Sequence, residues 1–336
     1  MKYKTLGNTQ VPAIGQGTGG VHDADIIRRG IDYGMTFIDT AESYKNEDIV
    51  GEAIRGIRDK VFIATKFSPQ HSGYKDVLSA CEGSLKRLGT DYIDLYQLHW
   101  QNHAVPLSET IEAMSVLLKD KVRYFGVCNM IPDFPVSSIQ TEYNLFDRSA
   151  EADVIPYCEK NNLITIAYSP LNHFYEMNPE KMLWLEEIAY KHEKTMVQIA
   201  LNWLTSRKLV IAIPKSHKPE HIKDNATATD FTLSEDEIKY IDNLFAFEIS
   251  YLDPKIIRIT KAGKFPQTLE EAQRNIYNFC PSPVEMAKGL IDIKPVRVEK
   301  VNNNLELIEG GLRYWAWVMK YGDKPIPTLI LERNVW

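Results

Sequence analysis

Short apolar runs alternate with amphipathic stretches along most of the chain, and this alternation is the feature that most restricts its fold. The apolar runs predict strands at residues 36–39, 61–66, 92–98, 122–128, 137–142, 163–168 and 209–213. The amphipathic stretches predict helices at residues 23–34, 46–57, 75–87, 107–119, 151–161, 180–193, 195–206 and 233–244. Repeated strand-then-helix order predicts a parallel sheet, and seven or eight such units suit a closed TIM (β/α)8 barrel.

One connection is too short to follow this order. Only residues 130–136 separate Asn129 from the strand expected at 137–142, and they include Pro132 and Pro135. A crossover between parallel strands usually needs about a dozen residues, and proline disfavours a helix interior. We therefore expect the barrel to lack one outer helix.

The pattern changes after Leu244. The later residues predict strand or extended chain at 249–259, a helix at 268–279, strands at 295–301 and 305–308, a helix at 312–321 and a strand at 326–331. This mixture predicts a small α+β domain. The expected organisation is therefore a barrel domain at residues 1–246 and a second domain at residues 247–336.

Composition and charge exclude several classes of protein. A net charge of −6 argues against a chain that coats nucleic acid, and no apolar run reaches membrane-spanning length. The first seven residues lack the apolar core of a signal peptide. The four cysteines form no C-x-x-C pair, which predicts reduced thiols and no metal site: Cys81, Cys128, Cys158 and Cys280. We expect a cytoplasmic protein with no membrane or nucleic-acid partner, of undetermined oligomeric state.

Ionisable side chains stand at the ends of three successive predicted strands. Asp39 and the nearby Tyr44 follow the first, Lys66 ends the second, and His99 ends the third. In a parallel α/β barrel the carboxyl ends of all strands meet on one face. An acid, a phenol, an amine and an imidazole brought together there predict a proton-transfer site.

A glycine-rich segment offers a competing interpretation. Residues 15–20 fit the pattern G-x-G-x-x-G, and Asp39 follows at a strand end, in outline a dinucleotide-binding Rossmann motif. That interpretation gives the strands ending in Lys66 and His99 no role. We therefore favour a glycine-rich first strand and turn, where a ligand ring approaches the backbone closely.

Residues 3–245 resemble the aldo-keto reductase family. The matching stretches are 37–44, 64–67, 84–100, 126–129 and 213–216. Several spaced motifs in the right order are more specific than any single one. The resemblance implies a TIM barrel, a nicotinamide cofactor extended across the strand ends, and hydride transfer to an aldehyde or ketone.

The chemistry of the four side chains agrees with this resemblance. Reduction of a carbonyl needs a proton for the developing alkoxide, and Tyr44 is the candidate general acid. A lysine cation about 4 Å away stabilises a phenolate by about 4 kcal/mol at an effective dielectric near 20, and Lys66 is the candidate cation. Asp39 would hold Lys66 in place, and His99 would hydrogen-bond the carbonyl oxygen. Each residue taken alone could equally be structural.

By the same resemblance, a second set of residues would hold the cofactor. Cys128, Asn129 and Gln140 match positions at the nicotinamide carboxamide, Tyr168 matches the aromatic that stacks on the ring, and Ser169 and Leu171 lie near the pyrophosphate. Lys215 and Ser216 match the pair at the adenosine 2′-phosphate, and Asp224 and Asn225 match the adenine site. His221 stands where the family usually has arginine, a better phosphate ligand. We expect NADP, with NAD as an alternative.

The predicted substrate mouth contains aromatic and polar side chains. These are Phe67, Trp100, Asn172, His173 and Phe174. They suit a small or partly apolar carbonyl compound. Each could also be ordinary packing in the barrel wall.

The second domain resembles the ParB/sulfiredoxin-like fold, on the stretches 287–298, 307–316 and 322–327. Gly311 falls where sulfiredoxins have their catalytic cysteine, so sulfinate reduction is not expected. No helix-turn-helix segment follows, so partition-type DNA binding is not expected either. Arg313 leaves a phosphate-binding role open, and the alternative is a structural domain that packs on the barrel.

Three functions follow from these observations. The first is an NAD(P)H-dependent reductase of aldehydes or ketones, or the reverse dehydrogenase, with Tyr44 as general acid. The second is a nicotinamide-binding redox sensor that acts through its C-terminal domain. The third couples a reductase to a nucleotide-dependent C-terminal enzyme.

Overall fold

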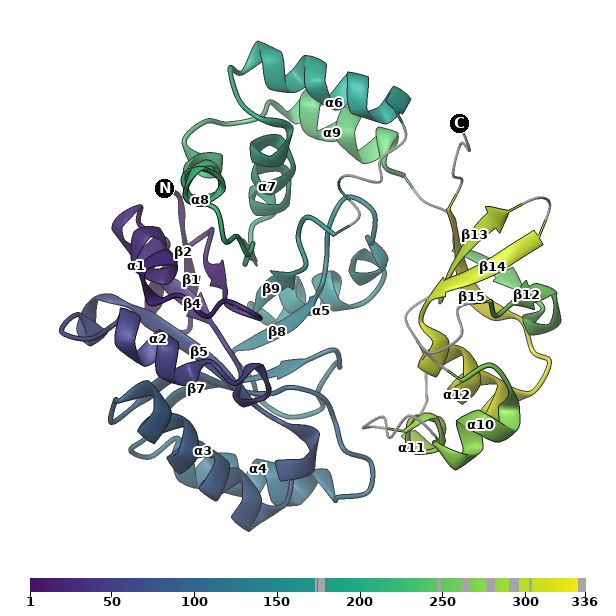
Figure 1. Ribbon diagram of the computed structural model, residues 1–336, viewed down its shortest axis with the longest axis horizontal. Coiled ribbons are helices and arrows are strands. Elements are labelled where there is room, and N and C mark those ends of the chain that lie inside the picture. Colours follow the sequence, from purple (N-terminus) through teal and green to yellow (C-terminus); the bar gives the residue numbers. More distant parts are fainter. Residues whose placement is uncertain are drawn as a thin grey trace. The chain divides into compact units, whose positions relative to one another are not determined.

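The computed structural model describes residues 1–172, 174, 179–246, 249–260, 266–275, 282–289, 296–301 and 304–331. The chain divides into two compact units (Figure 1). The first contains residues 1–101 and 108–245, and the second contains residues 102–107 and 246–336.

Eight parallel strands form the sheet of the first unit, in the order β10-β9-β8-β7-β6-β5-β4-β3. Their bounds are β3 (Gln16–Gly17), β4 (Phe37–Asp39), β5 (Phe62–Phe67), β6 (Ile93–Leu98), β7 (Val122–Cys128), β8 (Ser138–Glu142), β9 (Ile164–Tyr168) and β10 (Val210–Ala212). The two edges meet, because Ile14 forms a parallel bridge with Ala212 and the Gly15 N–H donates to the Ala212 carbonyl at 2.8 Å. The predicted barrel is thus confirmed.

Helices surround these strands (Figure 1). They are α1 (Ala24–Asp32), α2 (Glu47–Ala53), α3 (Tyr74–Leu88), α4 (Leu107–Leu117), α5 (Val154–Asn161), α6 (Pro179–Lys191), α7 (Met196–Ser206), α8 (Pro219–Ala226) and α9 (Glu235–Leu244). Residues 129–137, all of them described, form no helix between β7 and β8, which confirms the predicted loss of one outer helix. The sequence did not predict α8, whose first turn begins with Pro219.

An N-terminal hairpin, β1 (Tyr3–Leu6) and β2 (Thr9–Pro12), was also not predicted. Its Leu6 and Val11 are completely buried and join the core cluster of the barrel. That cluster contains apolar side chains from alternate strand positions: Phe37, Phe62, Ala64, Leu95, Ile164, Ile166, Ile211 and Ile213. The interior of the barrel is therefore a packed core below the strand ends.

The second unit has a five-stranded sheet in the order β11-β15-β13-β14-β12. Its elements are β11 (Ile249–Leu252), β12 (Ile257–Arg258), α10 (Leu269–Arg274), α11 (Pro283–Gly289), β13 (Val296–Val301), β14 (Asn304–Glu309), α12 (Gly311–Tyr321) and β15 (Ile326–Leu331). The described elements of this unit are both helices and strands, although α10 ends earlier than expected and α11 was not predicted. Its core joins α12 to the sheet through residues such as Trp315, Val296 and Leu307. None of the helices in the described ranges is long and apolar enough to cross a membrane.

Candidate active site

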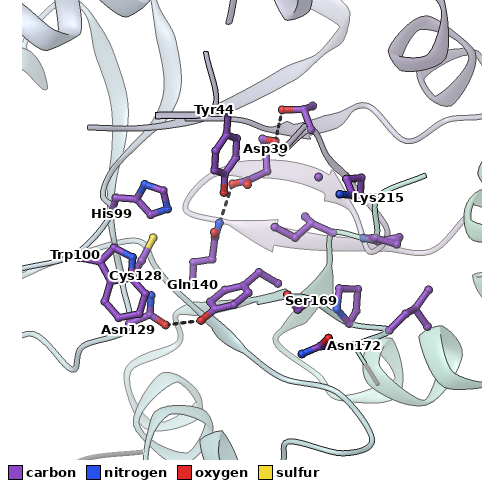
Figure 2. Close-up of a pocket in the computed structure, with 18 residues that line it drawn as sticks. Asp39, Tyr44, His99, Trp100, Cys128, Asn129, Gln140, Ser169, Asn172 and Lys215 are labelled. Atoms are coloured by element: carbon purple, nitrogen blue, oxygen red, sulfur yellow. Dashed lines mark hydrogen bonds between the residues drawn. The ribbon is translucent and has the colours of Figure 1, made fainter. Parts of the chain in front are cut away.

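A cleft of about 400 Å³ opens at the carboxyl ends of the barrel strands (Figure 2). Strand ends and the loops that follow them supply its lining: Gly17, Thr18, Gly19, Asp39, Tyr44, His99, Trp100, Cys128, Asn129, Gln140, Tyr168, Ser169, Pro170, Leu171, Asn172, Ile213, Pro214 and Lys215. The strand ends thus bring the predicted proton-transfer residues and much of the predicted cofactor set to one place.

Three of the predicted residues form a continuous chain of contacts. Lys66 Nζ lies 2.6 Å from Asp39 Oδ1 and 3.5 Å from the Tyr44 hydroxyl, and it also donates to the Thr40 carbonyl at 2.8 Å. Lys66 and Asp39 are almost completely buried, at 0% and 1% exposure. Buried charges persist only when they are paired and hydrogen-bonded. Asp39 and Lys66 therefore form a fixed ion pair that places a cation beside the phenol.

The electrostatic surroundings set the protonation states of this chain. Burial would lower the pKa of Lys66, but Asp39 and Tyr44 together raise that pKa above its ordinary value, so Lys66 is charged. Burial raises the pKa of Tyr44, and Lys66 opposes this effect. Tyr44 is therefore a neutral phenol in the free protein, with a cation positioned to stabilise its phenolate.

His99 lies beside the Tyr44 ring. The two rings are edge-on, with centroids 5.8 Å apart and planes at 80°. Burial and the charge of Lys66 lower the pKa of His99 to about 3. The imidazole is therefore neutral near pH 7 and carries one N–H. Its Nδ1 atom is 3.4 Å from the Ser43 hydroxyl.

The second oxygen of Asp39 is held by two amides. Gln140 Nε2 donates to Asp39 Oδ2 at 2.7 Å and Gln97 Nε2 donates to it at 3.5 Å. Sequence reasoning missed Gln97. Its position on β6, two residues before His99, could have indicated it, since alternate residues of a strand share a face.

The predicted nicotinamide end of the cleft combines amides with an aromatic ring. The Tyr168 hydroxyl donates to Asn129 Oδ1 at 3.0 Å, and Cys128 lines the same wall (Figure 2). Asn129 and Ser169 both have left-handed backbones, with φ of 59° and 48°. Such conformations are uncommon outside glycine and concentrate at functional sites.

The predicted phosphate end is much more exposed. Lys215 follows β10 and lines the cleft, and Ser216 and Asn225 line a smaller adjoining hollow. His221 and Asp224 lie on α8, exposed and half-buried respectively, and line neither cavity. The unpredicted helix α8 thus carries three of the residues expected at the adenosine end.

Only part of the predicted substrate mouth lines the cleft. Trp100, 40% exposed, and Asn172 do so. Phe67 is completely buried and packs on Tyr96 with ring centroids 5.0 Å apart, and Phe174 is buried outside the lining. These two are therefore wall residues, because an apolar ring at a strand end gains more by packing inward. His173 lies outside the described residues.

The sequence predicted that a ligand ring approaches the backbone of residues 15–20, but it assigned no individual residue of the backbone-rich wall of the cleft: Gly17, Thr18, Gly19, Pro170, Ile213 and Pro214. A side chain at Gly17 would place its Cβ 2.8 Å from the Ile213 carbonyl oxygen, and one at Gly19 would face the Tyr44 ring. The G-x-G-x-x-G segment was the available signal. Its glycines keep the first strand close to β10 and the cleft wall thin.

Comparison with known proteins agrees with this geometry. The profile of the aldo/keto reductase family matches residues 13–246. Methylglyoxal reductase YeaE of Escherichia coli (strain K12) is 36% identical over 264 residues, which cover 71% of this chain and 93% of that protein. Glyoxal reductase of Bacillus subtilis (strain 168) is 32% identical over 257 residues, covering 72% of this chain and 91% of that protein.

A solved structure shows the same similarity. The crystal structure of an aldo-keto reductase from Klebsiella pneumoniae in complex with NADPH aligns with a TM-score of 0.66 and 35% identity. The alignment covers 73% of this chain and 96% of that chain. By its barrel, its cleft and these matches, the chain belongs to the aldo/keto reductase family.

Proposed function

We propose that the cleft reduces an aldehyde or ketone to an alcohol, with Tyr44 as the general acid. As a member of its family the protein is an NAD(P)H-dependent oxidoreductase. The observation that carries the residue assignment is the contact chain from Asp39 through Lys66 to the Tyr44 hydroxyl at the floor of the cleft.

The proton transfer follows from the charges in this chain. Neutral Tyr44 holds a proton until negative charge develops on the substrate oxygen, and then donates it. The resulting phenolate lies 3.5 Å from the Lys66 ammonium group, which is completely buried and therefore stabilises the phenolate strongly. Asp39 keeps Lys66 oriented, and neutral His99 donates its N–H to the same substrate oxygen.

The cleft fits a nicotinamide cofactor, which supplies the hydride when bound. In the described part of the chain, Asn129 keeps its amide N–H groups and Gln140 keeps its Oε1 without a hydrogen-bond partner, because their other ends bind Tyr168 and Asp39. A primary carboxamide offers one carbonyl and one NH2 group, the complement of this pair. The Tyr168 ring would stack on the nicotinamide, while Cys128, Ser169 and Leu171 would line its path.

Lys215 supports NADP as the preferred cofactor. It is exposed at the rim of the cleft and forms no ion pair with any described residue, so its charge is available to a phosphate. Ser216 adjoins it, and Asp224, Asn225 and His221 follow within one helix. A histidine binds phosphate less well than arginine, so NADH should be accepted more readily than in a site with arginine.

The proposed substrate is a small aldehyde, such as a 2-oxoaldehyde. The described lining beyond Tyr44 and His99 offers Trp100 as an apolar wall and Asn172 as a polar one. Two relatives bear the names methylglyoxal reductase and glyoxal reductase. A short, polar dicarbonyl would satisfy both walls.

We also propose a ParB/sulfiredoxin-like fold for the second domain, at residues 247–336. In support, Gly310 has φ of 86° and caps the start of α12, and its missing side chain leaves room for the Arg313 guanidinium. Gly311 cannot supply a catalytic thiol, which favours a structural role. A cytoplasmic location is supported by the buried, free thiols of Cys81, Cys128 and Cys158.

Replacement of Tyr44 by phenylalanine tests the main proposal. Turnover of methylglyoxal with NADPH should fall about 10²- to 10⁴-fold, while NADPH binding, followed by cofactor fluorescence, should change less than about threefold because the hydroxyl is not a proposed cofactor ligand. The decrease of NADPH absorbance with time measures the turnover. Unchanged turnover would remove Tyr44 as the acid, and failure of the unmodified protein to bind either NADPH or NADH would overturn the proposed cofactor site.

A further inference from the structure

The side chains of one short turn make three separate contacts in and around the site. The 3-10 turn Glu42–Tyr44 follows β4, and its side chains contact residues in or directly after β5 and β6. Glu42 reaches Ser68 after β5, Ser43 reaches His99 after β6, and Tyr44 reaches Lys66 within β5. The role of Ser43 is not explained by proton transfer from Tyr44.

The position of the turn is fixed independently of Ser43. Glu42 Oε1 accepts a hydrogen bond from the Ser68 backbone N–H at 2.5 Å and lies 2.8 Å from His71 Nδ1. Lys45 closes the turn with a left-handed backbone, φ 54°, and its N–H donates to the Glu42 carbonyl. The Ser43 hydroxyl is therefore held beside His99 by the backbone that also positions Tyr44.

The neutral imidazole of His99 has two tautomers with opposite chemistry. With its proton on Nε2 and a lone pair on Nδ1, His99 can donate a hydrogen bond to a substrate oxygen. With the proton on Nδ1, it presents a lone pair from Nε2, which repels that oxygen. The hydrogen bond made by one ring nitrogen decides which tautomer is present.

We propose that Ser43 is a positioning residue, whose hydroxyl donates to Nδ1 of His99 and so keeps the imidazole proton on Nε2 for the substrate oxygen. The proposal rests on the function proposed above for His99. Nδ1 is the ring nitrogen that faces Ser43, at 3.4 Å, and Nε2 has no hydrogen-bond partner among the described residues. Hydrogen bonds in free enzymes are often long and tighten when substrate binds.

The charges around His99 favour this direction of donation. Burial and the charge of the Lys66 cation both oppose a second proton on the ring. A neutral ring must then accept at one nitrogen to donate at the other. The hydroxyl of Ser43 can both donate and accept, so it can supply the donor that Nδ1 needs.

Three variants test the proposal. Ser43→Ala removes the hydroxyl, Ser43→Thr keeps it, and Ser115→Ala is a matched control on α4, where the hydroxyl bonds only the Ile111 carbonyl. Long-range 1H–15N spectra of histidine-labelled protein report the tautomer of His99, with His99→Asn used to assign its signals. Turnover and NADPH affinity are measured on the same samples.

The expected result is a change confined to His99 and to turnover. In Ser43→Ala the His99 spectrum should shift from the Nε2–H tautomer towards a mixture, and kcat/KM for the carbonyl should fall about three- to tenfold. Ser43→Thr should restore both, and Ser115→Ala should match the unmodified protein. NADPH affinity should stay within about twofold throughout.

Two results would overturn the proposal. One is a His99 spectrum that is the same with and without the Ser43 hydroxyl, and the other is an Nδ1–H tautomer in the unmodified protein. The spectra report the His99 tautomer without catalysis, so they test the role of Ser43 even if the protein reduces no carbonyl. A failure to reduce any carbonyl would count against the proposed function instead.

Discussion

The two ends of the cleft are built on opposite principles. At the proton-transfer end, Asp39 and Lys66 are almost completely buried and joined at 2.6 Å. At the proposed phosphate end, Lys215 and His221 are exposed and the lysine has no ionic partner among the described residues. Charges in the first region therefore contribute to folding as well as to chemistry, whereas charges in the second can change cofactor affinity without disturbing the barrel.

The largest expected effect breaks the buried pair. Lys66→Met would leave the Asp39 carboxylate buried without its cation, so the free energy of unfolding should fall by about 3–5 kcal/mol, and turnover should be lost. Urea unfolding followed by circular dichroism measures the first effect. Lys191→Met is the matched control, because Lys191 is 69% exposed in its ion pair with Glu237 and should cost less than about 1 kcal/mol.

A second substitution separates stability from chemistry. Adding Asp39→Asn to Lys66→Met removes the unpaired carboxylate, so much of the lost stability should return while turnover stays low. If the double variant were no more stable than Lys66→Met, the unpaired charge of Asp39 would not be the cause of the loss.

An intermediate effect depends on pH. The pKa of His99 is lowered to about 3 in the folded protein, against about 6.5 in an unfolded chain. Below pH 6.5 the unfolded state therefore binds a proton that the folded state does not, and stability falls as pH falls towards 3. Between pH 7 and pH 5 this group should reduce the free energy of unfolding by about 2 kcal/mol.

Removal of the imidazole isolates that contribution. The stability of His99→Asn should fall less than that of the unmodified protein between pH 7 and pH 5, with each unfolding curve measured in urea at both values. Parallel pH dependences of the two proteins would contradict a buried, neutral imidazole at this position.

The smallest effect is expected at the exposed end. Lys215→Met should weaken NADPH binding about tenfold, or about 1.4 kcal/mol, with little change for NADH, and raised salt should reduce the difference. His221→Arg should strengthen NADPH binding severalfold. Fluorescence titration measures both, and Lys218→Met, a neighbouring exposed lysine outside the cleft lining, is the control. If Lys215→Met weakened NADPH and NADH binding equally, Lys215 would not be a ligand of the 2′-phosphate.

The same contrast explains what the sequence could predict. The strands and the residues at their ends were predictable, because strand spacing and parallel topology alone bring Asp39, Lys66 and His99 to one face. The missing helix between β7 and β8 was also predictable, because seven residues with two prolines cannot form a crossover helix.

Other features depend on tertiary packing that periodicity does not encode. Helix α8 is short and mostly polar, so it gave no clear apolar stripe. Phe67 follows Lys66 at a strand end, and Phe174 lies two residues after the lining residue Asn172, yet both rings are buried in the wall. The hydrogen bond between Ser43 and His99 joins residues from different loops, and only the folded chain shows how close they lie.

Closure of the barrel by Ile14 and Ala212 has a consequence for biosynthesis. The strands that carry Asp39, Lys66 and His99 leave the ribosome early and can pair with their sequence neighbours. The first strand must wait for β10 before its free edge is covered, and contacts between such distant segments form slowly. A partly synthesised chain thus exposes two open sheet edges, which favour aggregation and chaperone binding. Lys215 and Ser216 come shortly after β10, so the cofactor can bind fully only once β10 is in place. Cofactor binding would then shift the equilibrium towards the closed barrel.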